Sequence, residues 1–157
     1  RRAHPPKVER NWKEKINRKE NLLAKNSAIA ATANKEIVVK RGHKFNEKLT
    51  LPVIVDDKFE KIKKTKDVIK ALDKIGVYED ILRASNGKHI RAGIDKIPKS
   101  ILIVSTKDNI LKCSKNLTGV DVIKPSNINI EYLAPGGDAG RLTIFTKSAL
   151  NELGGAK

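Results

Sequence analysis

Residues 101–123 read ILIVSTKDNILKCSKNLTGVDVI. The runs at 101–104 and 120–123 are short, apolar and β-branched, which is typical of strands buried on both faces. The segment between them predicts a short helix over 109–115. Strands joined by a helical connection of this length form parallel βαβ units with right-handed crossovers. This stretch therefore predicts an α/β fold with a parallel sheet flanked by helices.

The segments on either side continue the alternation. Residues 51–55, LPVIV, predict another buried strand, and 59–75 has the apolar spacing of a helix that ends at Gly76 in a left-handed cap. The other expected elements are a helix over 78–85, a basic loop over 88–99, a turn-rich segment over 131–137, the run 141–145, and a helix over 147–153 capped by Thr146. Three strands make a thin sheet, so we expect an N-terminal part outside this sequence to supply at least one more.

The N-terminal third has a different character. Residues 1–8, RRAHPPKV, cannot form a helix because adjacent prolines fix φ and favour extended conformations before them. We expect a basic, extended arm there and a globular α/β domain over 9–157. Residues 10–33 contain no Gly or Pro and predict one long helix with a basic first half. Its small residues at 27–33 would pack against the sheet, and a polar connection would follow.

The charge of the chain is strongly positive. Its 157 residues include 33 Lys+Arg and 18 Asp+Glu, for a net charge of +15 at pH 7. Such an imbalance destabilises a compact state unless a polyanion neutralises it, which favours nucleic acid as the partner. The 39% of hydrophobic residues can form a core, but their runs are too short to cross a membrane or to act as a secretion signal. The single cysteine, Cys113, excludes an intramolecular disulfide and favours a reducing compartment.

Motifs for catalysis are weak. The glycine-rich segment 136–140 follows a loop and lacks the Lys-Ser/Thr ending of a phosphate cradle. Asp56 and Asp57 end a strand, where metal-binding acids often lie in open α/β sheets. Acids in this position also cap the next helix and balance nearby lysines, and we favour that structural role. We expect no cofactor and no metal, and the alternative is a metal-dependent enzyme acting on RNA or nucleotides.

Basic segments with a few planar side chains point to RNA. Charges bind phosphates and rings stack on unpaired bases, while only six aromatic residues argue against a sequence-reading aromatic sheet. We therefore expect structured RNA to be bound through the shape of its backbone. The residues assigned to RNA contact are Arg1, Arg2, His4, Lys7, Arg10, Trp12, Lys13, Lys15, Arg18, Arg41, His43, Lys44, Lys88, Arg91 and Arg141.

Seven stretches of the chain resemble, in order, one known family. They are RRAHPPK (1–7), KINRKE (15–20), SAIAATA (27–33), RGH (41–43), KKTKDV (63–68), GVDV (119–122) and LAPGG with GRLTI (133–144). The family is the universal large-subunit ribosomal protein four, in its archaeal and eukaryotic form. The resemblance runs nearly end to end.

That resemblance implies a Rossmann-like domain without a cofactor and a structural, non-enzymatic role in translation. The implied partners are large-subunit ribosomal RNA and neighbouring ribosomal proteins in the cytoplasmic ribonucleoprotein, with no membrane and no small-molecule substrate. A regulator that binds messenger RNA outside the ribosome is a further alternative.

The resemblance also implies a long loop that reaches the wall of the nascent-peptide exit tunnel. Residues 1–8 resemble the end of that loop, so the family's N-terminal part is missing from this sequence. Family members usually follow the match to 90–93 with a longer basic, glycine-rich run. Here residue 93 is followed directly by IDK.

Overall fold

A four-stranded parallel sheet forms the centre of the protein in the computed structural model, which describes residues 2–46, 48–91 and 93–155. Its strands lie in the order β1 (Val53–Val55), β6 (Thr143–Thr146), β4 (Leu102–Val104) and β5 (Asp121–Ile123). Each neighbouring pair runs parallel. The predicted α/β class is confirmed, and the run at 141–145 supplies the fourth strand.

The strand side chains alternate between two hydrophobic cores, because successive residues of a strand point to opposite faces of the sheet. Ile103 and Ile144 belong to one core, and Leu102 and Phe145 belong to the other. The three residues of β4 have no solvent exposure. Both faces of the sheet are therefore covered, as its continuous apolar runs predict.

The helices divide between these cores. The Ile103 side is covered by α2 (Lys35–Lys40), α3 (Thr65–Ile75), α4 (Tyr78–Asn86) and α5 (Asp108–Ser114). The Leu102 side is covered by α1 (Arg18–Ala31), α6 (Ile130–Leu133) and α7 (Lys147–Gly155). Short 3₁₀ turns are η1 (Phe59–Lys61), η2 (Pro125–Asn127) and η3 (Pro135–Gly137). Within the described ranges, every helix is too short or too polar to cross a membrane.

Two predicted helix caps are confirmed. Gly76 ends α3 in the left-handed region, at φ 86°. The Thr146 hydroxyl accepts a hydrogen bond from the Ala149 N–H at 3.3 Å and so caps the start of α7. Both caps satisfy helix-end backbone groups that have no partner within the helix.

The N-terminal helix is shorter than the predicted 10–33. α1 begins at Arg18, and the Asn17 side chain caps it by accepting from the Lys19 N–H at 3.0 Å. All of 2–17 is exposed, so no packing compensates the cost of helix nucleation there. The other end follows the prediction, since Ala28 is buried in the Leu102-side core.

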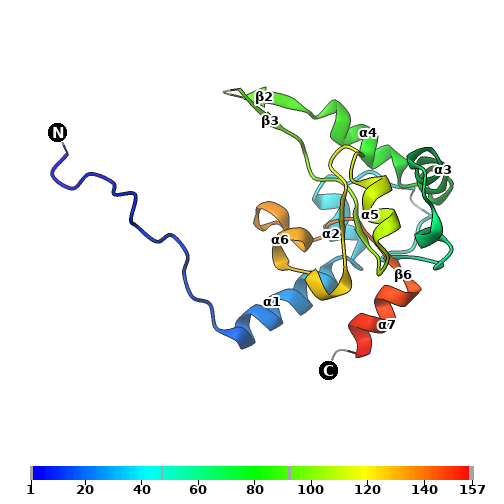
Figure 1. The fold of residues 1–157 in the computed structure, drawn as a ribbon, viewed down its shortest axis with the longest axis horizontal. Helices are drawn as coiled ribbons and strands as arrows, with labels where there is room; N and C mark the ends of the chain where they lie inside the picture. The colour runs from blue at the N-terminus through cyan, green and yellow to red at the C-terminus, as the bar shows by residue number, and fades with distance from the viewer. Residues whose placement is uncertain (1, 47, 92, 156–157) are drawn as a thin grey trace.

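Residues 2–17 run as an extended segment away from the globular body (Figure 1). They contain no helix or strand. The segment is longer than the predicted arm, because the helix expected from residue 10 does not form. The division of the chain at residue 8, and the arm's role in RNA binding, stay predictions.

Two further elements differ from the prediction. Where a polar connection was expected, α2 forms, with Asn34 accepting from the Glu36 and Ile37 N–H groups and Val38 fully buried. Where an irregular loop was expected over 88–99, β2 (His89–Arg91) and β3 (Ile94–Lys96) form an antiparallel hairpin. Gly93, at φ 75°, lies in its turn, a conformation that favours glycine. The hairpin projects from the end of α4 (Figure 1).

Candidate RNA-binding surface

The edge of the sheet where ligands of open α/β folds usually bind is filled by protein side chains. Glu60, from η1, is 1% exposed. Its Oε1 accepts hydrogen bonds from the Thr146 hydroxyl at 2.7 Å and the Ser105 hydroxyl at 3.0 Å. Burial acts to raise the pKa of Glu60, but hydrogen bonds from Thr146, Thr106 and Ser105 outweigh it and lower the pKa. The satisfied carboxylate holds the strand ends together.

The acidic pair beside this edge also has structural partners. Asp57 Oδ1 accepts from the backbone N–H and the hydroxyl of Ser148, at 3.0 and 2.8 Å, and so caps α7. Asp56 pairs with Lys147, which lowers the pKa of Asp56. Among the residues that the structure describes, no group of three or more His, Cys, Asp or Glu could hold a metal ion. Both carboxylates therefore have structural partners, which agrees with the structural role favoured above.

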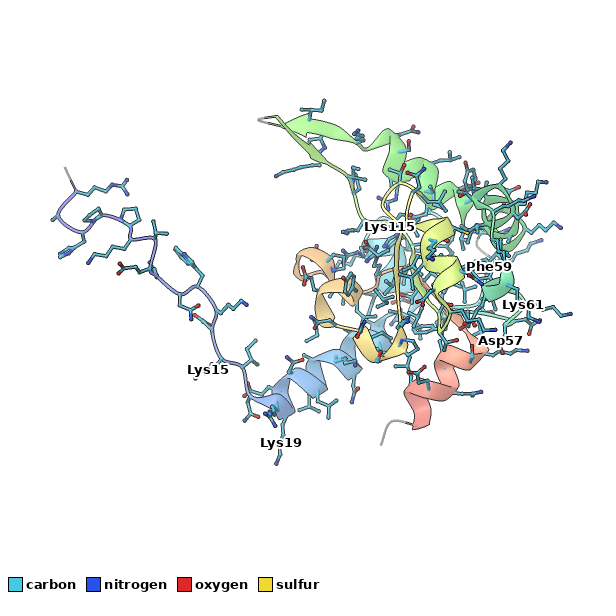
Figure 2. All side chains as sticks on the ribbon, viewed as in Figure 1. Lys15, Lys19, Asp57, Phe59, Lys61 and Lys115 are labelled. Carbon is cyan, nitrogen blue, oxygen red and sulfur yellow. The ribbon has the colours of Figure 1, made fainter. Side chains whose placement is uncertain are left out.

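The predicted contact residues of the N-terminal segment are all exposed. They are Arg2, His4, Lys7, Arg10, Trp12, Lys13 and Lys15, together with Arg18 at the start of α1. Arg1 lies outside the described residues. Trp12, Lys13 and Lys15 lie in the extended segment rather than on a helix, which corrects the predicted basic helix face. Figure 2 shows Lys15 and Lys19 on the part of the chain that projects from the body.

Within this segment, Arg10 and Trp12 form a planar, charged unit. The Arg10 guanidinium lies 4.3 Å from the centroid of the Trp12 ring, and Trp12 is 75% exposed. A cation over an aromatic face is attracted by the ring quadrupole. The pair combines a stacking surface for an unpaired base with a phosphate-binding charge.

The second predicted patch, at 41–44, is only partly on the surface. Lys44 is exposed, but the His43 side chain is 1% exposed. His43 was predicted as an exposed contact, but its side chain is buried, and its contact with RNA stays a prediction. Its Nδ1 lies 2.9 Å from Asp80 Oδ2, so the imidazole serves a buried polar cluster.

Asp80 is the centre of that cluster and is fully buried. It accepts hydrogen bonds from the Arg83 Nε at 2.8 Å, the Lys44 N–H at 2.9 Å and the Ser100 hydroxyl at 2.7 Å. Burial acts to raise its pKa, but the hydrogen bonds from His43 and Arg83 outweigh burial and hold the pKa of Asp80 well below its usual range. Because the carboxylate is charged, it accepts from His43 Nδ1–H.

Arg141 is also buried, at 0% exposure, and its predicted contact with RNA is corrected. Its guanidinium donates to the Ser100 carbonyl at 2.7 Å and the Tyr132 carbonyl at 2.9 Å, and it pairs with Asp121 at 2.7 Å. These bonds join the start of β4 to α6 and β5. Glycine-rich surroundings in the sequence did not reveal that the side chain points inward.

Arg41 is half-buried and donates to the carbonyls of Pro135 and Asp138. Burial lowers the pKa of Arg41, the carboxylate of Asp138 partly offsets this, and the charge of Arg83 adds to the lowering. Arg41 forms no ion pair within the part of the chain that the structure describes. Its charge is therefore stabilised by two backbone carbonyls and by the nearby Asp138 carboxylate.

The third predicted patch lies on and beside the hairpin. Lys88 is exposed just before β2, and Arg91 lies within β2, with its side chain outside the description. Ile90 is 72% exposed, so the hairpin presents apolar as well as basic surface.

The second patch and the base of the hairpin meet at one cavity of about 340 Å³. Arg83 links them, because its Nη2 donates to the Lys99 carbonyl at 3.0 Å. The cavity is lined by Arg41, His43, Arg83, Pro98, Lys99, Pro135, Gly136 and Asp138. Neither Arg83 nor Lys99 was among the predicted contacts. No local motif could reveal them, since four distant segments of the chain build the wall.

Comparison with known proteins identifies relatives over almost the whole chain. The model of the Ribosomal protein L4/L1 family matches residues 1–156. The chain is 52% identical to the large ribosomal subunit protein uL4 of Methanocaldococcus jannaschii, with 98% of this chain and 64% of that protein covered. It is 50% identical to uL4 of Thermoplasma acidophilum, with 96% and 62% covered. It is 49% identical to uL4 of Archaeoglobus fulgidus, with 98% and 64% covered.

Proposed function

Because the chain belongs to the Ribosomal protein L4/L1 family, we propose that the whole protein is a structural constituent of the large ribosomal subunit. It binds large-subunit ribosomal RNA, contacts neighbouring ribosomal proteins and supports assembly in the cytoplasmic ribosome, without catalysing a reaction. The family match over residues 1–156 carries this proposal. The chain spans 62% to 64% of the length of these curated relatives.

The surface supports the proposal physically. The net charge of +15 favours a polyanionic partner, and the exposed residues of 2–17 place several cations on an extended backbone that can follow RNA. We assign residues 1–8 to an arm that lies in RNA near the nascent-peptide exit tunnel, and 9–157 to the globular domain. The filled carboxyl edge of the sheet, with Glu60 satisfied by hydroxyl groups, supports a non-enzymatic role.

Sedimentation of a tagged copy of the whole protein tests this function. The protein is expected in the large-subunit fraction and in translating ribosomes, and it is expected to remain there after a high-salt wash. A tagged unrelated protein of equal net charge is the control, since adherence by charge alone is lost in salt. Recovery only at the top of the gradient, or only with messenger RNA, would contradict the proposal.

The salt dependence of RNA binding provides a second test. If phosphate contacts dominate, the logarithm of affinity falls linearly with the logarithm of salt concentration. Each Lys or Arg contact that is removed lowers the slope by about 0.7 to 0.9. An affinity that does not change with salt would refute binding through phosphate neutralisation.

A further inference from the structure

The cavity between α2, α4, the base of the hairpin and η3 has a cationic wall. Arg41, Arg83 and Lys99 line it together with one acidic residue, Asp138. Arg83 pairs with Asp80 at 2.8 Å and Lys99 pairs with Asp121 at 3.0 Å, so Arg41 is the lining arginine without an ion pair in the part of the chain that the structure describes. The arrangement brings cations together from segments far apart in the chain. An anion in the cavity would relieve the repulsion between Arg41 and Arg83 that contributes to the lowered pKa of Arg41.

Arg41 is held in place while keeping donors for a ligand. Its Nη1 and Nη2 donate to the Asp138 and Pro135 carbonyls, which anchor the guanidinium to the loop around η3. A guanidinium has five N–H donors, and these two bonds leave others available. A positioned guanidinium loses less side-chain entropy when it binds an anion than a freely rotating one.

Arg83 is positioned in the same way from the other side. Asp80 orients it through Nε at 2.8 Å and Nη2 at 3.2 Å, and the Lys99 carbonyl accepts from Nη2. These bonds use Nε and Nη2, so the donors on Nη1 are left for a ligand. Two guanidinium groups thus flank the cavity, each fixed by protein acceptors.

His43 provides an independent indication that the cavity takes a ligand. Its side chain is 1% exposed and lies in the cavity wall, and its Nε2 is buried without a hydrogen-bond partner. A buried polar atom without a partner costs free energy, and such an atom calls for a specific explanation. Nδ1 donates to Asp80, so Nε2 is the ring atom left without a partner.

We propose that this cavity binds one backbone phosphate of RNA, held by Arg41 and Arg83, with His43 Nε2 completing the site. A phosphodiester carries one negative charge and two non-bridging oxygens, which match the forked donors of arginine. In the neutral ring, Nε2 accepts a hydrogen bond from the adjacent ribose 2′-hydroxyl; in the charged ring, it donates to the phosphate. The inference rests on the proposed function, because that function makes RNA the source of the phosphate.

The test compares two charge-removing substitutions at neighbouring positions. Arg41→Gln removes a cavity cation, whereas Lys40→Gln removes an exposed charge that does not line the cavity. With a transcript of large-subunit ribosomal RNA as the probe, Arg41→Gln is expected to weaken binding about tenfold. It should also lower the salt slope by about 0.7 to 0.9. Lys40→Gln is expected to change affinity less than about threefold.

Phosphate-ethylation interference on the same transcript locates the contact. Ethylation of one phosphate should block RNA binding by the wild-type protein and by the Lys40→Gln variant. It should not weaken RNA binding by the Arg41→Gln variant any further. If Arg41→Gln lowers the melting temperature, Arg41→Lys replaces it, because lysine keeps the charge but lacks the forked donors, so affinity should still fall while the salt slope is kept. An equal loss of RNA affinity in the cavity and control variants would overturn the inference. So would an ethylation-interference pattern that is the same for the cavity variant as for the wild-type protein.

The ¹⁵N resonance of the His43 ring reports ligand binding directly. It would not change on addition of RNA if His43 had only a structural role. In imidazole ¹⁵N spectra, the Nε2 resonance of His43 should shift when a short RNA is added and should stay in place with the uncharged methylphosphonate analogue. Saturation by inorganic phosphate as tightly as by RNA would indicate a site for free anions and would overturn the assignment to RNA. Failure of the wild-type protein to bind ribosomal RNA would instead contradict the proposed function.

Discussion

Replacing Asp80 by Asn should unfold the protein at a much lower denaturant concentration. Asp80 is fully buried and accepts from His43, Arg83, Lys44 and Ser100. The substitution removes the charge and places an NH₂ group where Oδ2 receives N–H and O–H donors. Two hydrogen bonds to a charged acceptor contribute about 3 to 6 kcal/mol together, and breaking a buried ion pair by removing one partner costs about 3 to 5 kcal/mol. We therefore expect a loss of about 3 to 5 kcal/mol in the free energy of unfolding.

Urea denaturation followed by circular dichroism measures this loss. With an m value of about 2 kcal/mol/M, the midpoint should fall by about 1.5 to 2.5 M. Glu79→Gln is the matched control, because Glu79 precedes Asp80 in α4 and is exposed. Its free energy of unfolding should change by less than about 0.5 kcal/mol.

The pH dependence of the difference provides a second check. The folded-state pKa of Asp80 is lowered, so its contribution is present above the pKa of the unfolded chain, about 3.9, and is lost as pH falls toward the folded-state pKa. The difference in the free energy of unfolding between the wild-type and Asp80→Asn proteins should therefore be constant above about pH 5 and shrink below about pH 4. A loss under about 1 kcal/mol at pH 7 would refute the reasoning, as would a gap that is unchanged at pH 3.

Three other results are expected. Gly119→Ala should destabilise the domain far more than Gly136→Ala in thermal unfolding. Both have positive φ, but a Cβ at Gly119 would lie 2.4 Å from the Pro98 carbonyl oxygen, whereas one at Gly136 meets nothing within 4 Å; equal effects would contradict the steric argument. Deleting residues 1–7 should weaken RNA binding in filter assays without changing the melting temperature of the free protein, because the described residues 2–7 are exposed; a fall of many degrees would make the segment part of the fold. Replacing Asp56 and Asp57 by Asn should leave incorporation into large subunits intact in gradient profiles, and a lost hydrolytic activity would instead revive the enzyme alternative.

Local chemistry accounts for the elements that the sequence predicted correctly. The β-branched run at 101–104 favours a buried strand wherever it lies, and Gly76 favours a left-handed helix end because it has no Cβ. The helix expected from residue 10 fails because helix propensity is a weak preference that needs packing to be realised, and 2–17 is exposed. The hairpin over 89–96 was missed because its strands are short and its alternation is weak.

The candidate site divides in the same way. Sequence reasoning identified the basic character of 41–44, and the structure shows that only part of this segment is exposed. Arg141 and His43 resemble surface cations in the sequence, yet both are buried against acceptors supplied by distant segments. Arg83 and Lys99 were not identified, because their place in the cavity depends on how α4 and the hairpin pack.

The sequence by itself determined the net charge of +15, the parallel α/β class and the family, because composition and local patterning of apolar residues are properties of the chain alone. Tertiary structure alone decided which cations are available to RNA. Whether a guanidinium faces solvent or a carbonyl depends on residues brought together from positions as far apart as 41 and 138. Burial of a charge is stable only where such acceptors converge, and that convergence arises only when the chain packs.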